Sequence, residues 1–117
     1  MTNSVQTGIS AKCVPCTGLL KPLPMFEIAN LLLQLPEWKL AEDRASILRE
    51  FRARNYVHAM AILNEVAIVA EQEGHHPNHS LTKYSRLSFQ LTTFAAKGLT
   101  MNDFVMAKLI EEVLLRR

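Results

Sequence analysis

Two adjacent histidines are the most concentrated chemistry in this sequence. His75 and His76 follow Gly74 and precede Pro77. Imidazoles exchange protons near neutral pH, so neighbouring ones can act as general acid and general base. Proline biases the preceding residue toward an extended conformation, so the two side chains point in different directions and need not share a role. For so short a pattern the favoured interpretation is an exposed polar loop after a helix, with acid–base catalysis as the alternative.

The histidines do not have the spacing of a helical zinc site. His75, His76 and His79 lie close together in the sequence. The HExxH zinc motif places two histidines four residues apart on one helix face. Gly74 and Pro77 interrupt any helix through this stretch. We therefore expect no metal here.

The cysteines form a single C-x2-C pair, Cys13 and Cys16. Alone they supply two of the four ligands of a structural zinc. No βαβ pattern of the kind that accompanies a redox CxxC follows them. We interpret them as unlinked thiols, with a structural zinc or a redox switch as alternatives, and we predict no cofactor.

Size and composition fit one small soluble domain. The chain has 117 residues, and 49% of them are hydrophobic. The formal charge is +2 and the basic residues are scattered, which argues against nucleic acid as the main partner. No apolar run approaches the roughly 20 residues that span a bilayer. The first twelve residues lack the apolar core of a secretory signal, so we expect a cytoplasmic protein and no membrane association.

The chain divides into a flexible N-terminal arm with the cysteine pair, residues 1–22, and a domain, residues 23–117. Periodicity and turn residues predict six elements in the domain. They are a helix over 25–34, strands over 38–42 and 46–52, a helix over 55–73, a strand region over 81–93 and a helix over 100–115.

Capping residues mark the helix ends. Asn55 is a good N-cap for the long central helix. Gly74 supplies the left-handed residue that ends it. Thr100 and Asp103 form the [ST]-x-x-[DE] start of the last helix. The two adjacent histidines would therefore follow the end of one helix directly.

The apolar pattern predicts which residues are buried. Leu87, Phe89 and Leu91 alternate with polar residues, as in a half-buried strand. His58, on the central helix, is expected at the surface or in an interface. The apolar stripe of the helix over 55–73 is predicted to consist of Tyr56, Met60, Leu63, Ala67 and Ala70. It is widened by Ala59, Ile62, Val66 and Val69. The expected core aromatics are Trp38, Phe51, Tyr56, Phe89 and Phe104.

Strands in runs, rather than in strict alternation with helices, predict an α+β fold with helices on one face of an antiparallel sheet. The other sheet face would be exposed or used for association.

The central stretch resembles the pterin-4a-carbinolamine dehydratases. The family pattern has a Glu, then His-His-Pro, an aromatic, an alternating strand ending in Thr-His, Gly-Leu-Ser/Thr and an Asp. The matching positions are Glu71, His75, His76, Pro77, Tyr84, Thr93, Gly98, Leu99, Thr100 and Asp103. KCVPCTGLLKPL, LPEWKL and the stretch REFRARNYVHAMAILNEVAIVAE are also similar to family segments, so the resemblance covers nearly the whole chain.

The resemblance implies a fold, a substrate and a set of site residues. The fold is a four-stranded antiparallel sheet with helices on one side, and copies associate as a homodimer or tetramer. The substrate is a pterin, from which the enzymes expel a 4a-hydroxyl group. The implied catalytic residues are His75, His76 and Asp103. The implied substrate-binding residues are Glu71, Pro77, Tyr84 and Thr93.

One position departs from the family pattern. Phe94 follows Thr93 where the family has its third active-site histidine. A phenyl ring cannot give or take a proton, and losing one general acid or base typically removes about 10²–10⁴ in rate. The substitution predicts a degraded active site.

Three functions are compatible with these residues. We favour a non-catalytic, dehydratase-like assembly factor, resembling the family members encoded with α-carboxysomes and implicated in RuBisCO assembly. Its partner would be the RuBisCO large subunit, and its location the cytoplasm or the carboxysome. The alternative is an active 4a-hydroxytetrahydrobiopterin dehydratase, a lyase that works with His75, His76 and Asp103. Binding to a transcription factor is the third, and the modest charge argues against direct DNA contact.

Overall fold

The computed structural model describes residues 8–15 and 21–116. In chain order the elements are α1 (Met25–Leu32), β1 (Lys39–Leu40), β2 (Ile47–Arg52), α2 (Tyr56–Glu73), β3 (Asn78–Thr82), β4 (Arg86–Leu91), the 3-10 helix η2 (Phe94–Ala96) and α3 (Met101–Arg116).

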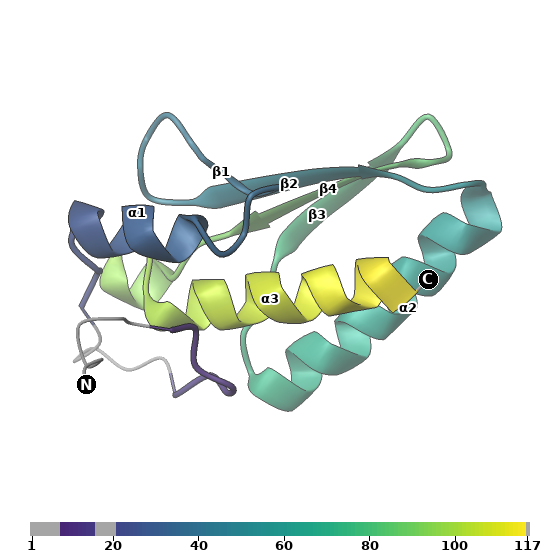
Figure 1. Ribbon diagram of the computed structural model, residues 1–117. Coiled ribbons are helices and arrows are strands. Elements are labelled where there is room, and N and C mark those ends of the chain that lie inside the picture. Colours follow the sequence, from purple (N-terminus) through teal and green to yellow (C-terminus); the bar gives the residue numbers. More distant parts are fainter. Residues whose placement is uncertain (1–7, 16–20, 117) are drawn as a thin grey trace.

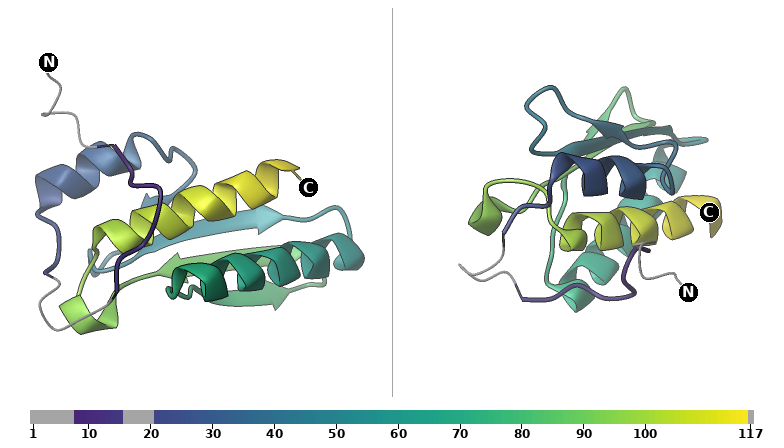
Figure 2. Two further views of the ribbon diagram at one scale, coloured as in Figure 1. Left: turned by 90° about the horizontal axis from the view of Figure 1, so that it is seen from below. Right: turned by 60° about the vertical axis from the view of Figure 1, so that its left-hand side comes forward.

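The strands form one antiparallel sheet in the order β1-β2-β4-β3. The helices α1, α2 and α3 lie on one side of this sheet, and the other side has no helix over it (Figures 1 and 2). This confirms the predicted α+β fold with four antiparallel strands. None of the helices in the described part of the chain is long and apolar enough to cross a membrane.

The core lies between the sheet and the three helices, and α3 contributes the most buried residues to it. In β4, Leu87, Phe89 and Leu91 are buried, and the residues between them are not, as their alternation predicted. They point toward the helices, where Phe104 and Ile110 of α3 are also fully buried. This two-layer packing holds the first turn of α3 against the end of β4.

The buried face of α2 differs from the predicted stripe. Tyr56, Met60 and Ala67 are exposed, so Tyr56 is not a core residue. Both sides of this helix are apolar, and periodicity alone therefore could not tell the core side from the outer side. The buried residues are His58, Ala59, Ile62, Val66 and Ala70.

The prediction that His58 lies at the surface or in an interface was wrong. Its side chain is 7% exposed, and its ring meets that of Phe51 edge to face, with the ring centroids 6.3 Å apart. The N–H of Arg54 donates to His58 Nδ1 at 2.9 Å. Asn55 caps α2 as predicted, by accepting from the N–H of His58.

The single strand region predicted over residues 81–93 is a β-hairpin. It comprises β3 and β4, joined by a three-residue turn, 83–85, in which Lys83 and Tyr84 have φ of 48° and 55°. Left-handed backbone in turns favours Asn and Gly. Because Lys83 and Tyr84 are neither Asn nor Gly, the turn could not be predicted from the sequence.

The first strand is also shorter than predicted. Only Lys39 and Leu40 pair with β2, and Arg44 turns the chain with φ of 59°. Trp38 precedes the strand and is buried, with its indole N–H donating to Glu111 of α3. This contact draws the start of the strand toward the helices.

Part of the N-terminal arm lies against the domain. The N–H of Cys13 donates to Glu73 at the end of α2. Val14 exchanges two hydrogen bonds with the side-chain amide of Asn102 in α3. The thiol of Cys13 donates to the carbonyl of Asn102 at 3.6 Å, whereas Cys16 lies outside the described residues. The domain boundary at residue 23 stays a prediction.

Candidate active site

The end of α2 positions the first histidine. Gly74 adopts the left-handed conformation, with φ of 70°, as predicted for a helix C-cap. The N–H groups of Gly74 and His75 both donate to the carbonyl of Ala70. This turn directs His75 inward, where only 6% of its surface is exposed.

A buried carboxylate receives that histidine. His75 Nε2 lies 2.7 Å from Asp103 Oδ1, and Asp103 is completely buried in the first turn of α3. Asp103 Oδ2 accepts from the hydroxyl of Thr93 at 2.8 Å and from the N–H of Thr100 at 2.9 Å. The hydroxyl of Thr93 lies 2.8 Å from that of Thr100, which donates because the proton of Thr93 is engaged by Asp103. Every oxygen of the carboxylate is thus satisfied.

The second histidine has its own carboxylate at the surface. His76 Nε2 lies 2.5 Å from Glu71 Oε2, one helical turn earlier in α2. Both side chains are largely exposed, His76 by 58% and Glu71 by 78%. The adjacent imidazoles therefore differ in environment, one buried and one in water.

A cavity of about 170 Å³ lies beside the exposed pair. It is smaller than the roughly 300–1,000 Å³ of sites that enclose drug-sized ligands, so a ligand here would be covered on one side only. The polar and apolar residues that line it are Leu63, Val66, Ala67, Ala70, Glu71, His76, Pro77 and His79.

The structure brings together most of the predicted site residues. Glu71 and Pro77 join His76 at the cavity, and Thr93 joins His75 and Asp103 in the buried network. Tyr84 is placed apart from them, since it occupies the β3–β4 turn and is 63% exposed. The two histidines precede β3 at its opposite end, since this strand begins at Asn78.

Phe94 follows Thr93 directly but points to solvent. It begins η2, its side chain is 79% exposed, and it is not among the residues that line the cavity. The phenyl ring therefore leaves the cavity beside His76 open.

Sequence reasoning missed two contributors. His79 lines the cavity, although it had been considered only as a metal ligand. Thr100 had been assigned to capping, and it also donates to Thr93. An alternating strand places His79 on the same sheet face as Phe89, toward α2, which was the available signal.

The arrangement can transfer protons. A carboxylate that holds one ring nitrogen fixes the orientation and tautomer of an imidazole, which is how general acid–base histidines are positioned. No group of three or more His, Cys, Asp or Glu side chains with metal-binding geometry occurs among residues 8–15 and 21–116.

Two solved structures share this fold. A transcriptional coactivator/pterin dehydratase from Brucella melitensis superposes with a TM-score of 0.75 at 27% identity, covering 80% of this chain and 98% of that one. A pterin dehydratase-like protein identified as a RuBisCO assembly factor in the alpha-carboxysome superposes with a TM-score of 0.58, covering 66% of this chain and 88% of that one. At 18% identity the second likeness concerns the fold alone.

Sequence relatives carry one family name. A protein of Nitrosomonas eutropha is 42% identical over 105 residues, covering 89% of this chain and 90% of its own length. One of Halorhodospira halophila is 37% identical over 99 residues, with coverages of 85% and 90%. Both are named provisionally as pterin-4-alpha-carbinolamine dehydratases. The profile described as pterin 4 alpha carbinolamine dehydratase matches residues 21–113. This chain belongs to the pterin-4a-carbinolamine dehydratase family.

Proposed function

We propose that this protein is a pterin-4a-carbinolamine dehydratase that works at a reduced rate with His75 and His76. The observation that carries the proposal is the exposed His76–Glu71 pair beside an open cavity. Unlike the buried pair, it contributes little to stability, because surface ion pairs are typically worth about 0–1 kcal/mol. The His76–Glu71 pair is therefore better explained by a role in proton transfer than by a role in stability.

Expelling water from a carbinolamine needs an acid that protonates the departing hydroxyl and a base that takes a proton from the ring. His76 can exchange a proton through Nδ1, because Glu71 holds Nε2. Asp103 holds His75 in one orientation. The aliphatic side of the cavity, formed by Leu63 and Val66, offers a flat apolar surface to a ring system.

Phe94 lowers the expected rate without closing the site. The missing imidazole accounts for a loss of about 10²–10⁴ in rate. Because the phenyl side chain lies in solvent, it does not compete with a ligand for the cavity. This placement shifts the balance toward slow catalysis and away from the non-catalytic role that the sequence alone favoured.

The second candidate is a non-catalytic assembly factor for RuBisCO in the α-carboxysome. Its support is Phe94 itself, an exposed phenyl group where the family has a proton-transfer residue, together with the fold shared with one such factor. Exposed aromatics are favourable anchors in protein interfaces. On this reading the partner is the RuBisCO large subunit, and no pterin turnover occurs.

Association of copies is a further part of the proposal. Large apolar side chains are exposed along the outer side of α2, namely Tyr56, Val57, Met60 and Ile68. Burying them against a second copy would remove apolar surface from water. A homodimer or tetramer is expected, and sedimentation velocity measures it.

The deciding experiment compares dehydration of a 4a-hydroxytetrahydropterin by the wild type, Phe94→His, Phe94→Ala and His76→Ala. We expect turnover by the wild type, none by His76→Ala, and an increase of about 10²–10⁴ for Phe94→His. Phe94→Ala is the matched control, which removes the ring without adding a proton carrier and should resemble the wild type.

A wild type as inactive as His76→Ala would refute slow catalysis. In that case rescue by Phe94→His would show a competent cavity that lacks its third histidine. Absence of pterin dehydration by all four proteins would favour the assembly role. The yield of assembled RuBisCO with and without this protein would then test that role.

A further inference from the structure

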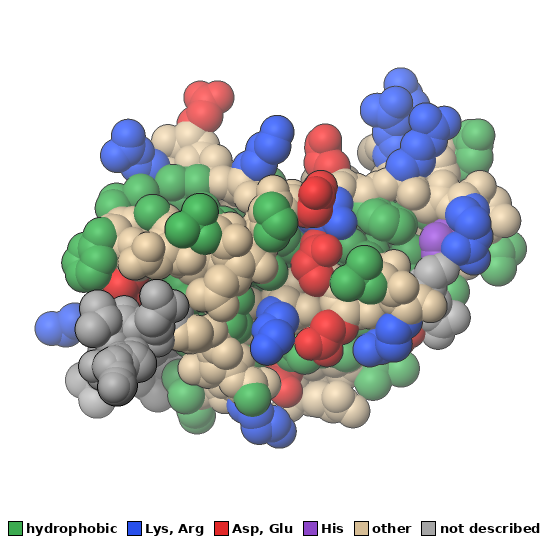
Figure 3. Space-filling model, in the orientation of Figure 1, with side chains coloured by type: hydrophobic (Ala, Val, Ile, Leu, Met, Phe, Trp, Pro, Cys, Tyr) green, Lys and Arg blue, Asp and Glu red, His purple; other side chains and the backbone are tan. Residues whose placement is uncertain are grey.

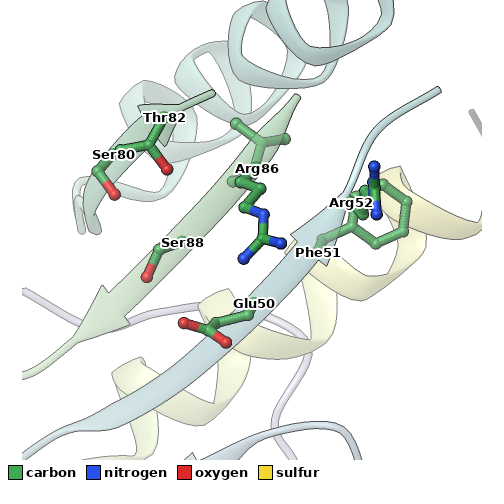
Figure 4. A pocket seen from close by; sticks show the side chains of 8 residues that line it. Glu50, Phe51, Arg52, Ser80, Thr82, Arg86 and Ser88 are labelled. Atoms are coloured by element: carbon green, nitrogen blue, oxygen red, sulfur yellow. The ribbon is translucent and has the colours of Figure 1, made fainter. Parts of the chain in front are cut away.

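The uncovered face of the sheet carries a hollow far from the histidines. It has a volume of about 390 Å³ and lies over β2, β4 and β3. Arg52 of β2 is directly opposite Arg86 of β4, and Thr82 of β3 is opposite Arg86 on the other side. Figure 4 shows the side chain of Arg86 reaching from β4 toward β2. The next row on this face consists of Glu50, Ser88 and Ser80, which also line the hollow.

The positive charge of this hollow, from Arg52 and Arg86, is only partly balanced by Glu50. Like charges directly opposite each other on neighbouring strands destabilise a sheet. The ion pairs found among residues 8–15 and 21–116 do not include Arg52, Arg86 or the adjacent Lys83. Lys and Arg side chains gather at the end of the molecule formed by the β3–β4 turn (Figure 3). The sheet therefore tolerates an unfavourable pair of arginines on a face that no helix covers.

The turn beside the hollow is unfavourable as well. Lys83 and Tyr84 both have positive φ, a conformation that is costly for residues other than glycine. The turn follows Thr82 and precedes Arg86, so it presents Tyr84, 63% exposed, next to the hollow. Local strain and paired like charges thus coincide at one place that does not serve the core.

We propose that this hollow binds an acidic segment of a partner protein. Guanidinium groups pair with carboxylates through two parallel hydrogen bonds, and Arg52 and Arg86 are placed side by side to do so. The hydroxyls of Ser80, Thr82 and Ser88 supply further donors, and Tyr84 supplies an exposed aromatic surface.

Glu50 decides the class of partner. Its carboxylate lies in the same hollow, so a ligand must offer a hydrogen-bond donor there as well as carboxylates to the arginines. A peptide meets both demands, since its backbone N–H groups can donate to Glu50. A nucleic acid strand or a free phosphate presents only acceptors at its charged groups and would be repelled by Glu50. The hollow is distinct from the histidine site, so the proposal does not depend on pterin turnover.

The test is fluorescence anisotropy of the full chain with a labelled peptide in which Glu alternates with Ala. We expect saturable binding that weakens as salt is added. Arg52→Glu and Arg86→Glu should each weaken it at least about ten-fold, the loss of one charge-assisted hydrogen bond. Lys108→Glu is the matched control, since Lys108 is an exposed cation on α3, in the layer on the other side of the sheet. It changes the net charge equally and should alter affinity less than about two-fold.

Folding does not confound this test. Arg52→Glu converts a like-charge cross-strand pair into an attractive one, so thermal unfolding should occur at an equal or higher temperature. Equal losses for Lys108→Glu and Arg52→Glu would overturn the proposal, because they would show attraction to net charge alone. So would failure of the Glu peptide to bind better than its Gln counterpart. Tighter binding of a thymidylate strand of equal charge would overturn the choice of a protein partner.

Discussion

Asp103→Asn is expected to destabilise the fold and disable His75 together. The carboxylate accepts from three groups, His75, Thr93 and Thr100, in a fully buried setting. An asparagine of the same shape keeps one acceptor oxygen and turns the other position into a donor. If the amide oxygen stays on Thr93 and Thr100, the new N–H₂ group faces His75 Nε2, which must then accept and move its proton to Nδ1.

The magnitude follows from those contacts. A hydrogen bond to a charged group contributes about 1.5–3 kcal/mol, against about 0.5–1.5 kcal/mol for a neutral one. Neutralising an acceptor with three donors should therefore lower the free energy of unfolding by about 2–4 kcal/mol. Domains of this size are typically stable by about 5–15 kcal/mol, so the variant should remain folded at room temperature. Turnover should fall by about 10²–10⁴ because His75 loses its tautomer and its orientation.

Equilibrium unfolding in urea, followed by the fluorescence of buried Trp38, measures the first effect, and pterin dehydration measures the second. Glu112→Gln is the control, since Glu112 is an exposed carboxylate on the same helix and should change stability by less than about 0.5 kcal/mol. An Asp103→Asn midpoint equal to that of the wild type would refute the assignment of Asp103 as the centre of the buried network.

Three further predictions concern other parts of the chain. His76→Ala should leave the urea midpoint within about 1 kcal/mol of wild type, because its pair with Glu71 is exposed, while turnover is lost; a large drop in stability would contradict this view of the pair. Asn102→Ala should speed hydrogen exchange at the amide of Val14, which donates to Asn102 Oδ1, and unchanged exchange would show that other contacts hold the arm. Tyr84→Gly should raise stability by about 1 kcal/mol in thermal melts by relieving a left-handed backbone, and an unchanged or lower melting temperature would contradict the strain assigned to this turn.

For α2, the sequence predicted the ends of the helix better than its buried face. Asn55 and Gly74 cap α2 as predicted, because capping depends on one residue and its immediate neighbours. The core side of α2 was predicted only in part: Ala59, Ile62, Val66 and Ala70 are buried, whereas the leading residues of the predicted stripe, such as Tyr56, are exposed. Apolar residues surround this helix, and only tertiary packing selects among them. The β3–β4 turn was missed for the opposite reason: Lys83 and Tyr84 carry no turn signature, and strand pairing imposes the conformation on them.

The site was predictable as a set of residues but not as a geometry. The resemblance grouped His75, Thr93 and Asp103, which the structure joins through hydrogen bonds among three separate segments. Nothing local in the sequence shows that one histidine is buried and its neighbour exposed. The sequence also does not show which way the side chain of Phe94 points. That direction depends on η2, a helix too short to be predicted from a periodic pattern.

Asp103 serves two purposes, and this has a consequence for how the site can change over generations. It accepts from the N–H of Thr100 at the start of α3, so it completes the helix terminus as well as holding His75. A lineage that gave up catalysis would still be selected to keep this carboxylate, since losing it endangers the fold. Position 94 is under no such constraint, because its side chain stands in solvent. Drift should therefore erase the third histidine first and the buried pair last, so the buried pair alone is a poor marker of an active enzyme.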